Sequence, residues 1–259
     1  MRRIADETDA TPVTGRKPGA LEGVRASAAR RLAPSCRTLA KYAMIATIKR
    51  IVFSLLPVKQ RFRRIYRRHY SYWKSSEVAS GLGSTLANTE NIRTALPALL
   101  REYNIETIVD VPCGDFNWMR CLVEHVPLIA TYTGLDIVPE IISENQRKYG
   151  TDRIQFAEFD VIKSVPLSAD LVLMRDCLIH FSFVDARRAL RNIKNSGSHY
   201  FLSTTHLEVA ENTDIVTGRW RPVNLEKAPY NFPPPLELIR ENEGHGKCLG
   251  LWRVSDMPD

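Results

Sequence analysis

Five short apolar runs between residues 107 and 204 set the pattern of this chain. Each run is bounded by turn-forming or polar residues, which indicates a buried strand. Segments with helical spacing follow most of the runs, and strands that alternate with helices predict a mostly parallel sheet in a doubly wound α/β fold. The predicted strands are 107–111, 130–135, 153–159, 170–174 and 199–204.

Helical spacing predicts helices at 117–124, 138–149 and 185–194. Helical sequence also runs from about residue 85 to Tyr103, with Pro97 suited to the first turn of a second short helix. After residue 204 the alternation stops. Residues 207–235 have no helical period, and 236–241 with 247–254 predict a C-terminal antiparallel hairpin.

The charge pattern divides the chain at about residue 73. Residues 1–73 hold 17 Lys and Arg against 4 Asp and Glu, whereas 74–259 hold 19 against 25, which gives the net charge of +7. We therefore expect a basic, partly disordered N-terminal arm (1–73) before an α/β domain (74–259). Acids at Asp6, Glu7 and Asp9 and the lack of an apolar run argue against a transit peptide and a secretory signal.

Two stretches of the arm have a pattern of their own. Residues 39–56 have the spacing of an amphipathic helix, which either packs on its own domain or a partner, or lies on a membrane surface. Residues 61–73 interleave arginines with aromatics, and these either dock on the domain or bind an anionic partner. We favour a membrane or an acidic partner for residues 39–73 over specific nucleic-acid binding, since no nucleic-acid module accompanies them. A solvated tail is the alternative.

The five cysteines form no C-x-x-C pair and are odd in number. This argues against a disulfide framework and a metal site, and it indicates a reducing, cytoplasmic setting. The arm adds the option of association with a membrane.

Three acids stand at the predicted strand ends: Asp110, Asp136 and Asp160. An acid at the end of the second strand can accept hydrogen bonds from the ribose hydroxyls of an adenosine-containing cofactor. Nicotinamide dinucleotides and S-adenosylmethionine both fit this pattern. A dinucleotide needs a G-x-G-x-x-G phosphate loop, but the first loop has one glycine, Gly114, and an acid, Asp115, that would repel phosphate. These residues favour S-adenosylmethionine.

At this point the sequence resembles a known family. Ile-Val-Asp-Val-Pro-Cys-Gly-Asp at 108–115 looks like motif I of the class I, Rossmann-like S-adenosylmethionine-dependent methyltransferases. The segments 133–136, 159–160 and 170–181 are similar to the family's ribose-binding, adenine-contacting and fourth motifs. The closest likeness is to small bacterial members with a Pro-Cys-Gly-Asp-Phe-Asn-Trp motif. The resemblance implies a cofactor site formed by Asp110, Pro112, Cys113, Gly114, Asp115, Asn117, Trp118, Asp136, Ile137, Asp160, Val161 and Arg175.

Two residues depart from the family pattern in motif I. Pro112 replaces the usual first glycine, and Phe116 replaces the last. Proline removes a backbone donor, and we expect Phe116 to block the close backbone approach that glycine allows.

Methyl transfer to oxygen or nitrogen often needs a general base. The candidates are His180, Asp176 and His206. The loop residues Arg219, Trp220, Arg221 and Tyr230 are candidates for binding the acceptor, with Arg219 and Arg221 on one side of an extended segment. We expect methyl transfer to a small-molecule or glycan-like acceptor. The alternative is a non-catalytic binding protein with this fold, recruited to a membrane or an acidic partner by its arm.

Overall fold

A computed structural model of the chain describes residues 44, 47–48, 51–73, 77–241 and 244–259. Residues 47–259 form one compact unit. This unit therefore includes residues 47–73, which the sequence analysis assigned to the arm. Most of the arm, and part of the amphipathic stretch 39–56, lie outside the described residues. No helix in the described part of the chain is long and apolar enough to cross a membrane.

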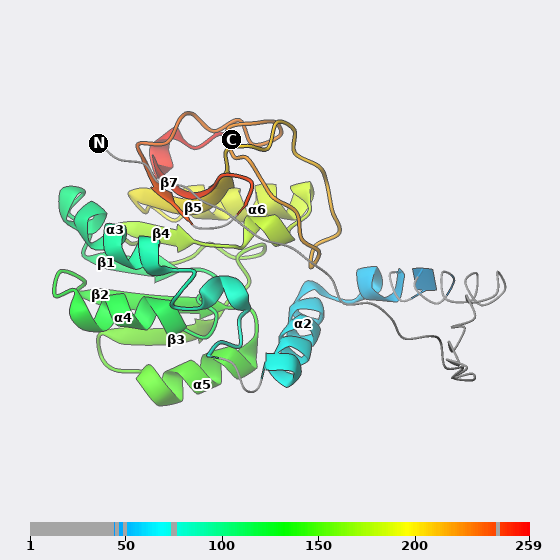
Figure 1. Cartoon of the computed structure of the whole chain (residues 1–259), viewed down its shortest axis with the longest axis horizontal. Helices are drawn as coiled ribbons and strands as arrows, with labels where there is room; N and C mark the ends of the chain where they lie inside the picture. Colours follow the sequence, from blue (N-terminus) through cyan, green and yellow to red (C-terminus); the bar gives the residue numbers. More distant parts are fainter. Residues whose placement is uncertain (1–43, 45–46, 49–50, 74–76, 242–243) are drawn as a thin grey trace, which may run out of the picture. The chain divides into compact units, whose positions relative to one another are not determined.

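A seven-stranded sheet forms the centre of the unit, in the order β3-β2-β1-β4-β5-β7-β6 (Figure 1). The first five strands in this order are parallel, and β7 pairs antiparallel with both β5 and β6. This arrangement confirms the predicted α/β fold with a C-terminal antiparallel hairpin. The strands are β1 (Thr107–Asp110), β2 (Thr131–Asp136), β3 (Ile154–Glu158), β4 (Leu171–Met174), β5 (Tyr200–His206), β6 (Glu237–Arg240) and β7 (Lys247–Arg253).

Helices cover both faces of the sheet because alternate strand residues point to opposite faces. Ile108 and Leu173 belong to one buried cluster, whereas Val109 and Met174 belong to the other. The first cluster includes side chains of α3 (Glu90–Glu102), α4 (Asn117–His125) and α5 (Pro139–Tyr149). The second includes side chains of α6 (Phe183–Lys194) and of the loop 223–232.

Pro97 lies in the middle of the continuous helix α3, so the prediction that it begins a second helix was wrong. A proline inside a helix removes one backbone hydrogen bond. Here Ile92, Leu96, Leu99 and Leu100 are all buried on one side of the helix. Tertiary packing therefore holds this segment helical across the proline.

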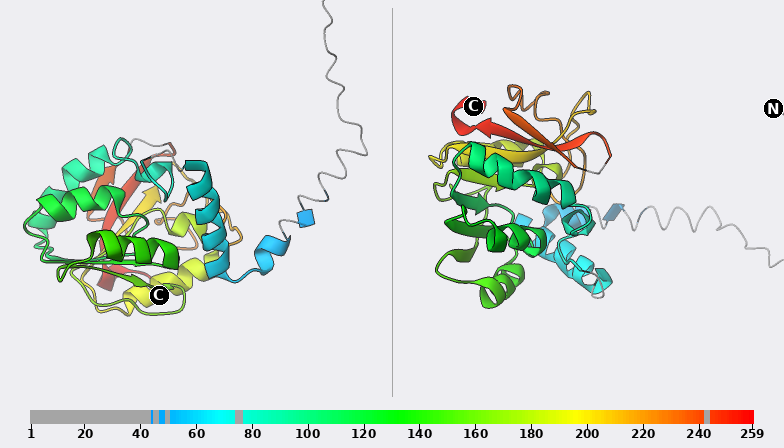
Figure 2. Two further views of the ribbon diagram at one scale, coloured as in Figure 1. Left: turned by 90° about the horizontal axis from the view of Figure 1, so that it is seen from below. Right: turned by 60° about the vertical axis from the view of Figure 1, so that its left-hand side comes forward.

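Helix α2 (Val58–Trp73) precedes the sheet in sequence and lies beside one end of it (Figures 1 and 2). Residues 51–55, which come just before it, are also helical. Phe62 of α2 packs edge-on against Phe181, with ring centroids 6.1 Å apart. This contact places α2 against the segment that follows β4.

Candidate functional site

A cavity of about 670 Å³ lies where β1, β2 and β4 end. The carboxyl ends of parallel strands are the usual ligand site of open α/β sheets. Most of the residues predicted from sequence line it: Asp110, Pro112, Cys113, Gly114, Trp118, Asp136, Ile137, Asp160, Val161, Arg175, Asp176, His180, His206, Arg219 and Trp220. Four predicted residues do not line it: Asp115, Asn117, Arg221 and Tyr230.

Asp136, the last residue of β2, is buried and fixed by main-chain donors. Its Oδ2 accepts a hydrogen bond from the Gly114 amide at 3.2 Å, and its Oδ1 accepts one from the Val138 amide at 2.9 Å. Burial raises its pKa to about 6, against the opposing effect of these amide donors. The carboxylate is thereby held in a fixed orientation at the cavity wall.

Asp110, at the end of β1, is also buried and lines the cavity. Tyr132 donates a hydrogen bond to its Oδ2 at 2.7 Å. Burial raises the pKa of Asp110 to about 7, and the negative charge of Asp136 adds to the rise. Two carboxylates thus face one ligand space, an arrangement that favours a ligand with positive charge or hydroxyl donors.

The loop after β1 turns at Gly114, which has a φ of 53°. A β-carbon at this position would lie 2.5 Å from the Ser80 Oγ. Glycine therefore allows residues 79–84 to approach the motif I loop closely. Ser80, Gly81, Gly83 and Ser84 contribute to the cavity wall.

Asp115 and Asn117 support this wall from behind. The Ser80 amide donates to Asp115 Oδ2 at 3.0 Å, and the Asp115 amide donates to the Ser80 Oγ at 2.7 Å. Asn117 Nδ2 donates to the Ser84 carbonyl at 3.1 Å. Both side chains hold the 79–84 loop in place and do not face the ligand space, in contrast to the sequence expectation.

Phe116 does not obstruct the cavity. It has a φ of 59°, and its ring is buried with Tyr132, Tyr149 and Phe156 at centroid distances of 4.8, 5.5 and 5.0 Å. The left-handed backbone turns the side chain away from the loop and into the core. The expectation that Phe116 would block backbone approach was therefore wrong.

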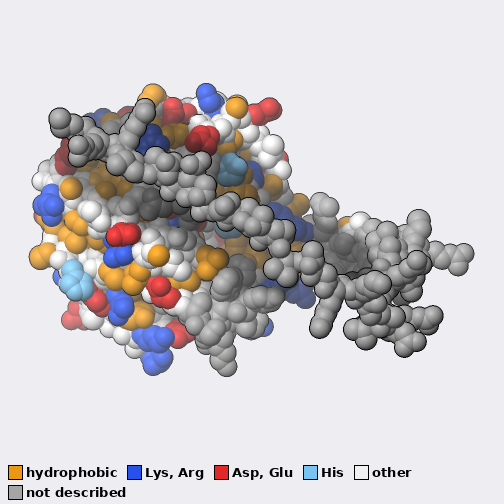
Figure 3. Space-filling view, viewed as in Figure 1, with side chains coloured by type: hydrophobic (Ala, Val, Ile, Leu, Met, Phe, Trp, Pro, Cys, Tyr) orange, Lys and Arg blue, Asp and Glu red, His pale blue; other side chains and the backbone are white. Residues whose placement is uncertain are grey.

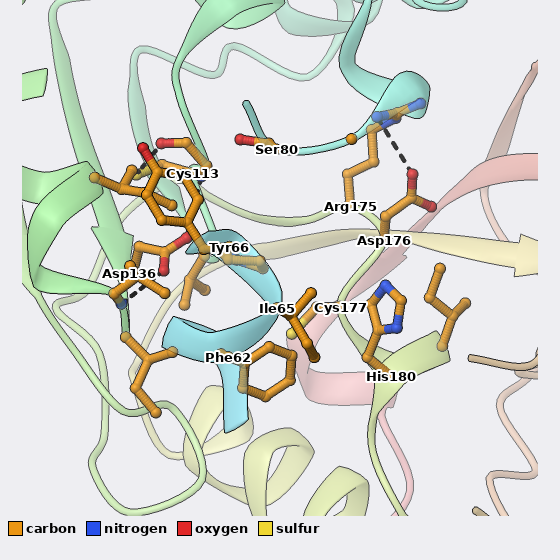
Figure 4. Close-up of a pocket in the computed structure, with 18 of the residues that line it drawn as sticks. Phe62, Ile65, Tyr66, Ser80, Cys113, Asp136, Arg175, Asp176, Cys177 and His180 are labelled. Carbon is orange, nitrogen blue, oxygen red and sulfur yellow. Dashed lines mark hydrogen bonds and ion pairs between the residues drawn. The ribbon is translucent and has the colours of Figure 1, made fainter. Parts of the chain in front are cut away.

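Helix α2 supplies a wall of the cavity that the sequence analysis did not assign to the site. Val58, Phe62, Ile65, Tyr66 and Arg68 line it. Tyr66 lies on the Asp136 side of the cavity, and Phe62 and Ile65 lie nearer to Cys177 and His180 (Figure 4). The apolar spacing of 58, 62, 65 and 66, which puts these residues on one helix face, was the signal that could have found this wall.

Ion pairs hold α2 against the domain. Arg63 Nε donates to Glu140 Oε1 at 3.0 Å, and Arg67 Nη2 donates to the same oxygen at 2.9 Å. Lys59 pairs with Glu158. The hydrogen bond from Arg63 lowers the pKa of Glu140 to about 2, against the opposing effect of burial. Some of the basic side chains of 58–73 therefore form ion pairs with acids of the domain. Other Lys and Arg side chains are visible at the surface in Figure 3.

A cluster of four charged residues, of which Arg175, Glu241 and Lys247 are buried and Asp176 is partly exposed, lies at the end of the cavity away from Asp136. Arg175 Nη2 donates to Glu241 Oε2 at 2.6 Å and to the Gly83 carbonyl at 2.9 Å, and its Nη1 lies 3.4 Å from Asp176 Oδ2. Lys247 Nζ lies 2.9 Å from Asp176 Oδ2 and 3.3 Å from Glu241 Oε2. Burial opposes ionisation of Asp176, but the charges of Arg175 and Lys247 outweigh it and lower its pKa to about 2.

Glu241 and Lys247 come from the C-terminal hairpin, and sequence reasoning missed both. The pairing of β6 with β7 brings these two residues together, as the Glu241 amide donates to the Lys247 carbonyl at 3.0 Å. Neither residue belongs to a recognised sequence motif. Only the antiparallel register puts them beside the fourth motif.

His180 and His206 both line the cavity but differ in their settings. His180 Nδ1 lies 2.8 Å from the Arg219 carbonyl oxygen. A carbonyl can only accept, so Nδ1 carries the proton and Nε2 is the acceptor nitrogen of the neutral ring. His206 is buried, which lowers its pKa. Its Nδ1 lies 3.2 Å from both the amide and the carbonyl of Val223.

The loop after β5 divides the predicted acceptor residues into two pairs. Arg219 and Trp220 line the cavity, and the Trp220 side chain is exposed. Arg221 is buried and donates to the carbonyls of Leu178 and Phe181 and to the Tyr230 hydroxyl, each at 2.9 Å. Arg221 and Tyr230 therefore do not face the ligand space, in contrast to the sequence expectation that Arg219 and Arg221 converge. They hold the loop onto the segment after β4.

Comparison with known proteins agrees with this geometry. Residues 108–196, which run from β1 to the end of α6, match the family profile described as a methyltransferase domain. No curated protein has a significant sequence match to the chain.

Among solved structures, the chain is similar to human N-acetylserotonin methyltransferase in complex with SAM. The TM-score is 0.53 at 16% identity, over 76% of this chain and 60% of that one. It is also similar to TnmH, with a TM-score of 0.49 at 16% identity over 64% and 55% of the two chains. The methyltransferase domain of bacterial CtHen1 gives 0.48 at 12% identity over 64% and 99%.

The fold and the matched domain define the class. The chain has a Rossmann-like fold of the kind seen in methyltransferases, and residues 108–196 match the methyltransferase-domain profile. Both findings support S-adenosylmethionine as the cofactor and methyl transfer as the reaction.

Proposed function

We propose that this protein transfers a methyl group from S-adenosylmethionine to an oxygen or nitrogen atom of a small-molecule or glycan-like acceptor. The observation that supports this most strongly is a single cavity that joins the strand-end acids to His180. The acids suit the cofactor, and the histidine suits proton removal from the acceptor.

The residues at the strand ends fit S-adenosylmethionine. Asp136 is held by the Gly114 and Val138 amides in a position to accept hydrogen bonds from ribose hydroxyls. Asp160 and Val161 line the cavity where an adenine ring would follow the ribose. The bound cofactor would supply a methyl group on a positive sulfonium, and the carboxylate of Asp110 nearby suits that charge. Tyr66 of α2 would cover the same end of the cavity.

Of the three candidate bases, His180 suits the role best. Its Nδ1 donates to the Arg219 carbonyl, which fixes the ring and makes Nε2 the basic nitrogen of the neutral imidazole. Asp176 is a poor base because its pKa is lowered to about 2 beside Arg175 and Lys247. His206 is buried and fixed against Val223. We assign Asp176 to orienting its cationic neighbours.

Arg219 and Trp220 would contact the acceptor. Both lie at the cavity wall next to His180, since the Gly218 amide donates to the His180 carbonyl at 2.8 Å. An exposed indole suits the face of a sugar or an aromatic ring, and a guanidinium suits an acceptor with negative charge or hydroxyl groups. These features support a polar acceptor with one flat face.

The test is methyl transfer from S-adenosylmethionine labelled in its methyl group to a panel of sugars, phenols and amines. Label recovered in an acceptor, and lost in the His180→Gln variant, would support the proposal. Cofactor binding without any transfer across the panel would support the alternative of a non-catalytic binding protein.

A further inference from the structure

A stripe of apolar side chains precedes α2 and is exposed. Ile48, Ile51, Val52 and Leu55 are 52, 53, 47 and 77% exposed. Their spacing is i, i+3, i+4 and i+7, which is the spacing of one helix face, and residues 47–48 and 51–55 are helical. An apolar helix face in water usually has a partner. We call these four residues the apolar stripe.

The other side of this segment is fixed to the domain. The Phe53 ring lies under the Arg219 guanidinium at 5.5 Å, and a β-carbon on Gly218 would lie 2.9 Å from the Phe53 ring. Arg61 of α2 donates to the carbonyls of Leu56 and Thr217 at 2.8 and 3.0 Å. The segment is thus held at the rim of the cavity, so the exposure of the apolar stripe is not the result of a detached tail.

The charge around the apolar stripe indicates what covers it. Residues 39–73 contain nine Lys and Arg and no Asp or Glu. Lys49 and Arg50 stand within the stripe in the sequence, and Arg64 of α2 is exposed. A second copy of this chain would bring the same positive charge against itself. An anionic lipid surface offers both an apolar layer and negative charge.

We propose that the apolar stripe and the basic residues around it bind the surface of an anionic bilayer. Ile48, Ile51, Val52 and Leu55 enter the boundary between headgroups and acyl chains, and the Lys and Arg side chains pair with anionic headgroups. The segment lies on the membrane and does not span it. Because Phe53 joins the segment to Arg219, this binding places the cavity rim next to the lipid surface. The inference does not depend on methyl transfer, since lipid binding needs neither cofactor nor acceptor.

The test is co-sedimentation of the full chain with vesicles of phosphatidylcholine alone and of phosphatidylcholine mixed with phosphatidylglycerol. We expect binding to the mixed vesicles, at least tenfold weaker binding to the neutral ones, and weaker binding as salt is raised. The double variant Ile51→Glu and Leu55→Glu should reduce binding to the mixed vesicles at least tenfold. Leu167→Glu is the matched control, since Leu167 is 65% exposed and far along the chain from the apolar stripe; it should bind as the parent does.

Three results would overturn the proposal: no binding to the mixed vesicles, equal loss in the Leu167→Glu control, or unchanged binding in the double variant. The main alternative is that a second copy of the chain covers the apolar stripe, and sedimentation equilibrium without lipid tests it. A parent that is dimeric, with a monomeric double variant and no lipid binding by either, would show that a second copy covers the apolar stripe. Circular dichroism of each variant checks that it is folded.

Discussion

His180 Nδ1 donates a hydrogen bond to the main-chain carbonyl of Arg219 at 2.8 Å. This bond joins the segment after β4 to the loop after β5, and it sets the tautomer of the histidine. The same loop supplies the two side chains that we assign to the acceptor. The proton-accepting atom and the acceptor-binding residues are therefore positioned together.

The His180→Gln variant should lose turnover by about 10²- to 10⁴-fold, the usual contribution of a general base. Binding of S-adenosylmethionine should stay within about twofold of the parent, because the proposed cofactor residues are unchanged. Steady-state kinetics and calorimetry measure the two effects separately. His199→Gln is the control, since His199 is exposed and precedes the first residue of β5, whereas the cavity lies at the carboxyl end of that strand. Equal turnover of the His180 variant and the parent would contradict the assignment.

The Glu140→Gln variant should loosen α2 because it weakens the pairs with Arg63 and Arg67. These groups are partly exposed, so each pair contributes roughly 1 kcal/mol or less. We expect severalfold faster amide hydrogen exchange in α2 and little change in β1 or β4. Glu144→Gln is the matched control, since Glu144 pairs with Lys148 inside α5. A similar effect of both variants on α2 would show that the Arg63 pair does not hold the helix.

The Asp110→Asn variant should change how stability depends on pH. The pKa of Asp110 in the folded protein is about 7, above its ordinary value of 3.8. Unfolding between these values releases a proton, so the contribution of Asp110 to stability falls as the pH rises from about 4 to about 7. Asparagine keeps an oxygen that can accept from Tyr132 but does not ionise. Thermal melting from pH 5 to pH 8 should therefore show that the Tm of the variant increases relative to the Tm of the parent as the pH rises. A difference in Tm that stays constant over this range would contradict this.

The Arg221→Met variant should lower the free energy of unfolding by about 2–4 kcal/mol. It removes the side-chain donor to the buried Phe181 carbonyl, and one of two donors to the Leu178 carbonyl, which still accepts from the Phe181 amide at 3.2 Å. Arg219→Met should cost about 1 kcal/mol or less, because its guanidinium stacks on Phe53 at the cavity rim. Urea unfolding measures both. A larger loss of stability in Arg219→Met than in Arg221→Met would contradict the assignment of Arg221 to holding the loop.

The fold could be predicted from sequence because parallel strands buried on both faces leave short apolar runs. The acids at their ends, such as Asp110 and Asp136, follow from the same pattern. The direction of the Phe116 side chain could not be predicted, because it depends on the sign of the backbone angle φ at this residue. The spacing of apolar residues gives no information about that sign. Arg219 and Arg221 could not be told apart in a loop without a period. The cluster of Glu241 and Lys247 depends on the register of the hairpin.

Helix α2 shows a different limit of prediction from sequence, which concerns the partner of its side chains. Its arginines and aromatics were equally compatible with a lipid surface and with the domain. The structure uses Arg63 and Arg67 for the domain and leaves Arg64 exposed. The contact of Phe62 with Phe181 sets the face of α2 that packs on the domain, and so it sets which arginines face the domain and which face solvent. The two residues are far apart in the sequence, so the pattern of α2 alone does not predict this contact.

Calorimetric titration of the protein with S-adenosylmethionine tests the central claim most directly. We predict one-to-one binding, and a loss of at least tenfold in affinity in the Asp136→Ala variant, because the carboxylate held by Gly114 and Val138 would no longer accept from the ribose. Asp152→Ala, which changes an exposed acid before β3, should bind as the parent does. No binding at millimolar cofactor, or equal binding by the parent and the Asp136 variant, would contradict the account.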